Sequence, residues 1–195
     1  MSVVHSRRHD RGGNDIRRTA RPGRGRRGFT LIELSIAISI LMIGMVSVLS
    51  ATSRMHSLRK QNRERAMAQN ATRSVAERIH SRAYELSADP GTWAEEMIAV
   101  FSPGGEFGDT FDVRGLSGVS DRPADGTITI LTDETATDQE IGFRIGLPRD
   151  LNGDGDADDP DVSADARVLP VLLEVQWRSQ SGTSSYRHAM YVLGY

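Results

Sequence analysis

One carboxylate in this 195-residue chain lies where carboxylates are rare. Glu33 is near the start of an apolar run that extends from Phe29 to about Ala51. At about 1.5 Å per residue, the run is long enough to cross a hydrocarbon core of about 30 Å. A carboxylate costs roughly 2.5–3.5 kcal/mol at the middle of a bilayer and less near its interface. We therefore expect Glu33 to be functional and to have a cationic partner.

A second group of residues has the spacing of metal ligands. Residues 150–161 fit the twelve-residue calcium-loop template, with oxygen ligands at the first, third and fifth positions, glycine at the sixth and an acid at the twelfth. The predicted Ca²⁺ ligands are Asp150, Asn152, Asp154, Asp156 through its carbonyl, Asp158 directly or through water, and Asp161. We expect a structural ion with a Kd on the order of 10⁻⁴–10⁻³ M.

The alternative for this loop is a solvated acidic turn without an ion. Two features depart from a helical EF-hand: the closing residue is Asp161 rather than a glutamate, and strands or coil are predicted on both sides. However, seven carboxylates lie between Asp150 and Asp165 and would repel one another without a cation. This repulsion favours the calcium interpretation.

The start of the apolar run combines Gly28, Phe29 and the sequence Thr-Leu-Ile-Glu after an arginine-rich leader. This junction resembles the processing site of the type IV prepilin family, which includes the pseudopilins of type II secretion. The resemblance implies that a prepilin peptidase cuts after Gly28 and methylates the new N-terminus at Phe29. It also implies that Glu33 acts in assembly and that mature subunits pack into a filament.

Elementary electrostatics agrees with this role for Glu33. Cleavage after Gly28 leaves an α-amino group on Phe29, and such a group has a pKa near 7.7–8.0. In a bundle of these helices, Glu33 of one subunit can pair with the amine of its neighbour, which favours one axial stagger over others. The alternative is that Glu33 extends toward the headgroups from an ordinary membrane anchor.

The charge distribution predicts the orientation in the membrane. Residues 1–28 contain nine arginines and two aspartates, so this segment has a charge of +7. Because the whole chain has a net charge of −2, residues 29–195 have a charge of −9. A basic segment before a first span remains in the cytoplasm, so the remainder is expected in the periplasm beyond a bacterial inner membrane. The acidic remainder argues against a nucleic-acid partner.

Two alternatives remain for the first residues of the chain. One is an RGG-like RNA-binding tail, and the other is a secretory signal peptide, for which residues 48–51 offer only a weak cleavage site.

Beyond the membrane the helix should continue to about residue 86, because no proline occurs between Pro22 and Pro90. It carries an apolar stripe, formed by Met67, Ala71, Val75, Ile79, Ala83 and Leu86. Asp89-Pro90-Gly91 should end it. Strands are predicted at 127–132, 141–145, 168–178 and 186–193, with a short one within 111–116 and an antiparallel hairpin from the last two.

These elements predict a pilin-like α+β fold, in which a long N-terminal helix packs on a small antiparallel sheet. We divide the chain into a cleaved leader (1–28), a transmembrane and assembly helix (29–51), the soluble half of that helix (52–88) and a periplasmic β-rich domain (89–195) with the acidic loop.

The five histidines are scattered and no catalytic motif is present, so we predict no enzyme. The strand at 168–178 and its hairpin resemble those of minor pseudopilins. We therefore predict a minor pseudopilin of type II secretion, whose partners are prepilin peptidase, other pilin subunits and the membrane. The alternatives are a minor pilin of a type IV pilus, acting in adhesion, motility or DNA uptake, and a membrane-anchored calcium-binding domain that does not assemble.

Overall fold

A computed structural model describes residues 28–88, 91–119, 122, 124–180 and 182–194. The predicted leader, apart from Gly28, lies outside the described residues. The chain divides into two compact units, residues 1–47 and 48–195, each of which is described by itself. The elements in order are α1 (Leu31–Leu86), α2 (Trp93–Val100), β1 (Thr110–Phe111), β2 (Gly126–Ile130), α3 (Asp138–Ile141), β3 (Val168–Ser179) and β4 (Gly182–Leu193).

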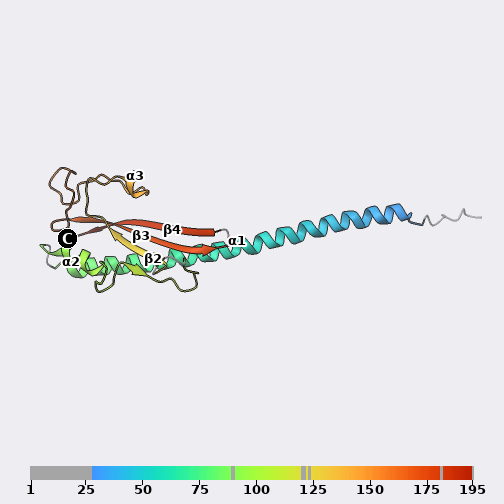
Figure 1. Ribbon diagram of the computed structural model, residues 1–195, viewed down its shortest axis with the longest axis horizontal. Coiled ribbons are helices and arrows are strands. Elements are labelled where there is room, and N and C mark those ends of the chain that lie inside the picture. The colour runs from blue at the N-terminus through green and yellow to red at the C-terminus, as the bar shows by residue number, and fades with distance from the viewer. Residues whose placement is uncertain (1–27, 89–90, 120–121, 123, 181, 195) are drawn as a thin grey trace, which may run out of the picture. The chain divides into compact units, whose positions relative to one another are not determined.

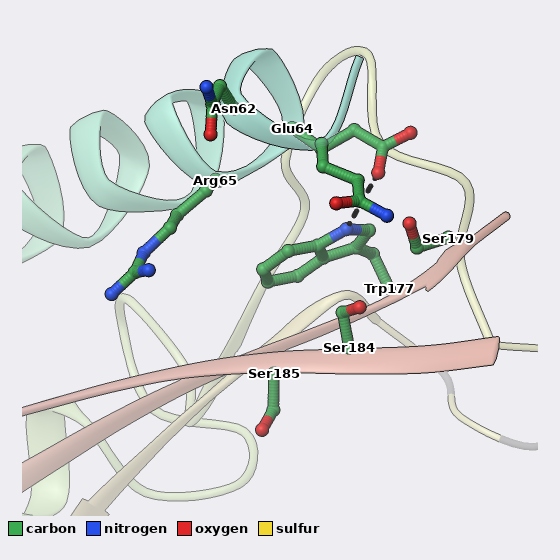
Figure 2. Close-up of a pocket in the computed structure, with 8 residues that line it drawn as sticks. Asn62, Glu64, Arg65, Trp177, Ser179, Ser184 and Ser185 are labelled. Carbon is green, nitrogen blue, oxygen red and sulfur yellow. Dashed lines mark hydrogen bonds between the residues drawn. The ribbon is translucent and has the colours of Figure 1, made fainter. Parts of the chain in front are cut away.

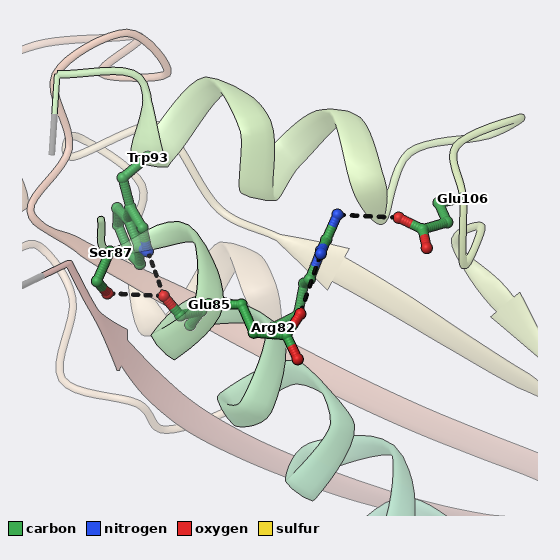
Figure 3. Close-up of polar contacts among 6 residues, drawn as sticks. Arg82, Glu85, Ser87, Trp93 and Glu106 are labelled. Carbon is green, nitrogen blue, oxygen red and sulfur yellow. Dashed lines mark hydrogen bonds and ion pairs between the residues drawn. The ribbon is translucent and has the colours of Figure 1, made fainter. Parts of the chain in front are cut away.

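The long helix α1 has the predicted extent, since its 56 residues end at Leu86. Its last turn is closed by neighbouring side chains rather than by a glycine cap. The carbonyl of Ala83 accepts hydrogen bonds from Ser87 Oγ at 2.7 Å and from Trp93 Nε1 at 3.1 Å (Figure 3). The same carbonyl also accepts a hydrogen bond from the backbone amide of Ser87 at 3.1 Å, and the bond from Trp93 ties α2 to the end of α1. Of the predicted stop, residues 89 and 90 lie outside the described residues.

The second unit contains a four-stranded antiparallel sheet in the order β1-β2-β3-β4 (Figure 1). The hairpin β3–β4 is in register from the pair Val168–Leu193 to the pair Ser179–Gly182 at its turn. The predicted hairpin is therefore confirmed. Alternation along β3 places its odd-numbered side chains on one buried face: Leu169, Val171, Leu173, Val175 and Trp177.

The apolar stripe of α1 covers this face of the sheet. Val75, Ile79 and Ala83 are buried in one core cluster with Leu169 and Leu173 of β3. A second cluster packs Met67 and Ala71 around Ala68, Val113, Val175 and Trp177. The predicted α+β fold, with a long helix packed on an antiparallel sheet, is confirmed.

A buried acid links α1 to the turn end of the hairpin. Glu64 is 8% exposed and accepts a hydrogen bond from Trp177 Nε1 at 3.2 Å (Figure 2). Lys60 lies one turn earlier, with its Nζ 3.8 Å from the Glu64 carboxylate. Nearby, Ser57 Oγ donates to Gln180 Oε1 at 3.1 Å. These contacts hold the far end of the hairpin against the helix.

The predicted strand at 141–145 is wrong. The segment begins as the last residue of α3, and Gly142 ends that helix with a positive φ of 65°. A capping box between Thr137 and Glu140 starts the helix, and these local hydrogen bonds outweigh the alternation of apolar residues. Within 111–116, only Phe111 belongs to a strand.

The segment after α3 is organised by the carboxylate of Asp138. It accepts hydrogen bonds from the backbone amides of Ile145, Gly146 and Leu147, at 2.9–3.2 Å. These bonds, that of Leu147 first, lower the pKa of Asp138 below its usual value. The connection therefore turns on itself instead of extending along the sheet.

Replacing Ile79 by alanine should reduce the stability of the second unit by about 2–5 kcal/mol, because Ile79 is fully buried between the helix and the sheet. The two tryptophans, Trp93 and Trp177, are both buried, so their fluorescence reports unfolding of this unit in the detergent-solubilised chain. Tyr84→Ala is the control on the same helix, since Tyr84 is 78% exposed and its loss should change the melting temperature little. Equal effects of the two substitutions would contradict this packing.

Candidate functional site

The predicted processing site lies just before the first turn of α1. Gly28, Phe29 and Thr30 precede the helix, which begins at Leu31. All three are exposed, and the Phe29 side chain is 89% exposed. A Cβ atom added at Gly28 would have no neighbour within 4 Å beyond the adjacent residues. Packing among the described residues therefore does not require glycine at this position.

Glu33 closes the N-terminus of its own helix through a capping box with Thr30. Glu33 N donates to Thr30 Oγ1 at 3.2 Å, while Thr30 N and Thr30 Oγ1 both donate to Glu33 Oε2 at 3.0 Å. A negative charge at this end also interacts favourably with the helix dipole. Both bonds from Thr30 end on Oε2, so Oε1 of Glu33 remains available to a further donor. This cap was not predicted, although Thr and Glu three residues apart are its sequence signature.

The apolar part of α1 that follows Glu33 is exposed on all sides. Its large hydrophobic side chains from Leu31 to Leu49 are each at least half exposed. In the part of the chain that the structure describes, α1 is the one helix long and apolar enough to span a membrane. A surface of this kind needs lipid or other apolar helices around it.

Comparison with protein families matches residues 23–49 to the prokaryotic N-terminal methylation motif. The chain carries the type IV prepilin-like signal. The match includes Gly28, Phe29 and Glu33, so the prepilin-like signal predicted from these residues is confirmed for this part of the chain. Comparisons with curated proteins and with solved structures found no match.

The signal supports a type IV pilin-like or pseudopilin precursor. It implies processing by a prepilin peptidase and assembly with other pilin subunits in a membrane. Together with this signal, the one apolar helix among the described residues suggests a single-pass membrane anchor, as in prepilins.

The acidic loop of the prepilin-like chain folds mainly through turns made by its own side chains. Asp150 accepts hydrogen bonds from the amides of Gly153 and Gly155, and Asn152 Oδ1 accepts one from Asp154 N at 2.9 Å. Gly153 and Gly155 have φ values of 82° and 108°, which favour glycine. The predicted glycine at the sixth position is thus in the conformation that such a loop requires.

The remaining predicted ligands divide into two groups. Asp154 accepts from Asp156 N, and Asp156 accepts from Asp158 N. A hydrogen bond with the Asp158 carboxyl group, together with the charges of Asp154 and Asp158, raises the pKa of Asp156. Asp161 instead caps the amide of Ser163 at 3.0 Å, which lowers the pKa of Asp161. The calcium-binding role of the six residues remains a prediction.

The structure adds an acid that the sequence analysis did not consider. Glu134 lies after β2, outside the calcium-loop template, and is completely buried. Oxygens of Glu134, Asp156 and Asp159 all lie within 4.8 Å of one another. The sequence contains no signal that separates Glu134 from its neighbour Asp133, because only the tertiary fold makes one of them buried.

Replacing Gly28 by valine should leave an uncut precursor in the membrane. A Cβ atom at this exposed position has no close neighbour among the described residues, so we expect a processing defect to reflect recognition by the peptidase rather than misfolding. Mass analysis of the N-terminus should show N-methyl-phenylalanine at residue 29 in the wild-type protein and the intact leader in the variant. Ser35→Ala, on the exposed helix after the junction, is the control and should be cut normally. Normal cleavage of Gly28→Val would exclude this site.

Proposed function

We propose that the chain is a minor pseudopilin, a membrane-inserted subunit that a prepilin peptidase processes and that assembles into the pseudopilus of a type II secretion system. The observation that carries this proposal is the exposed apolar helix with one capped carboxylate, Glu33, in its first turn. Its role in secretion would be mechanical, as a component of a filament that moves folded proteins outward, and not catalytic.

The assembly step follows from the separation of two groups. Cleavage after Gly28 creates a cationic α-amine on Phe29, four residues before Glu33. Four residues correspond to about 6 Å along a helix axis. A neighbouring helix displaced by about this distance brings its amine to Glu33 Oε1, which Thr30 leaves free. In a low dielectric, a helix with another stagger would leave both charges unpaired, which disfavours it.

The basic leader supports an inner-membrane location with a periplasmic C-terminal domain. Nine arginines before the span hold that end in the cytoplasm. The assignment to secretion, rather than to a type IV pilus, rests on the resemblance of β3 and its hairpin to minor pseudopilins. A chromosomal deletion separates the two: loss of export of folded proteins supports the pseudopilus, whereas loss of motility, adhesion or DNA uptake with normal export supports the pilus.

Glu33→Leu should still be cleaved but should fail to enter the filament, because the amine of Phe29 on the neighbouring subunit would lose its partner. The measurement is the amount of mature protein in the sheared filament fraction relative to the membrane fraction. Glu33→Gln separates the effect of the negative charge from that of the helix cap. Glutamine removes the charge but can still accept the hydrogen bonds from Thr30. Incorporation of both variants at the wild-type level would exclude the assembly role of Glu33 while leaving the processing site intact.

A further inference from the structure

Glu134 has one oxygen with two partners and one with none. Its Oε1 accepts hydrogen bonds from the backbone amides of Leu151 and Asn152, the first residues of the acidic loop after Asp150. Its Oε2 is buried and has no hydrogen-bond partner among the described residues. A buried carboxylate oxygen without a partner is strongly unfavourable. The fold therefore leaves this oxygen in need of a ligand.

Two exposed or half-buried carboxylates lie beside this buried one. One oxygen from each of Glu134, Asp156 and Asp159 lies within 4.8 Å of the other two. Because Ca²⁺ binds oxygen at 2.3–2.6 Å, two oxygens on one ion are at most about 5 Å apart. None of the ion pairs between described residues involves any of these three acids. Three carboxylates at this separation therefore lack a protein cation to offset their repulsion.

Hydrogen bonds between the segment after β2 and the acidic loop hold Glu134 and Asp159 in place independently of any ion. Glu134 N donates to the carbonyl of Asp159 at 3.0 Å, and Val162 N donates to the carbonyl of Thr132 at 2.8 Å. Asn152 Nδ2 donates to Asp159 Oδ2 at 3.2 Å. The segment after β2 and the end of the acidic loop thus form one unit, which brings residues far apart in the sequence together.

We propose that Glu134, Asp156 and Asp159 bind a divalent calcium ion at the base of the acidic loop, with the buried Glu134 rather than Asp161 as the closing ligand. The donors are all oxygens, and the loop turns on two glycines, so the site can adapt to the six to eight ligands of Ca²⁺ more readily than to the strict octahedron of Mg²⁺. Water and backbone carbonyls complete the coordination. This proposal does not rest on assembly into a filament.

The decisive comparison is between Glu134→Gln and Asp161→Asn. Calcium binding to the full chain in detergent micelles is measured by titration calorimetry after EGTA treatment, and by the rise in melting temperature from tryptophan fluorescence. We expect the wild type to bind with a Kd on the order of 10⁻⁴–10⁻³ M. Glu134→Gln should weaken binding by about tenfold or more, because a carboxylate ligand is lost. Asp161→Asn should bind within about twofold of the wild type, since the Asp161 carboxylate forms hydrogen bonds with Ser163 and Thr132 and is not among the three clustered acids.

Two further variants keep the test decisive. Asp156→Asn alters an exposed ligand and should weaken binding like Glu134→Gln, even if the latter destabilises the fold. Asp133→Asn removes a charge next to Glu134 without touching the site and should bind like the wild type. The proposal is overturned if the wild type shows no calcium binding, which would mean that the cluster holds no ion. It is also overturned if Asp161→Asn abolishes binding while Glu134→Gln and Asp156→Asn do not, which would favour the twelve-residue loop.

Discussion

The structure depends on the burial of one stripe of α1 against the odd-numbered face of β3. Ile79, Leu169 and Leu173 are fully buried in this contact, and each contributes roughly 1.5–3 kcal/mol by leaving water. A four-stranded antiparallel sheet with one apolar face is not stable while that face is in water. The second half of α1 therefore completes the core of the second unit, and it cannot detach without exposing the sheet.

The same helix uses two different surroundings along its length. In the second unit its apolar residues recur about every four positions and meet the sheet, while Arg73 and Glu77 pair on the exposed surface at 3.1 Å. Before Leu49 the helix carries exposed apolar side chains around its whole circumference. A sheet packed on one side could therefore cover only part of this apolar surface. The first half must be solvated by lipid or by other helices, which is the requirement of a membrane anchor and of a filament core. The methylation motif at residues 23–49 coincides with this half.

Polar side chains define where the covering elements join. Glu64 binds Trp177 at the turn end of the hairpin, and Arg82 bridges Glu85 and Glu106 at the other end of the helix, with both nitrogen–oxygen distances 3.0 Å (Figure 3). At the base of the acidic loop, Glu134 joins the loop to the segment after β2, because it accepts hydrogen bonds from two loop amides. Buried carboxylates such as Glu64 and Glu134 require partners, so their contacts favour one arrangement of the loops over an otherwise apolar core. The contacts of Arg82 lie at the surface.

The sequence by itself determined the features that depend on local pattern. The membrane-length helix, its apolar stripe, the hairpin and the Gly28–Phe29 junction with Glu33 each follow from residues close together in the chain. The strand predicted at 141–145 is wrong for a local reason, since the capping box of Thr137 and Glu140 starts α3 just before it. The tertiary structure decided the features that depend on burial and on distant contacts. It buried Glu134 beside Asp156 and Asp159 and turned Asp161 toward Ser163. Alternation of residue types cannot reveal such choices, because the free energy of a carboxylate depends on what the folded chain places around it.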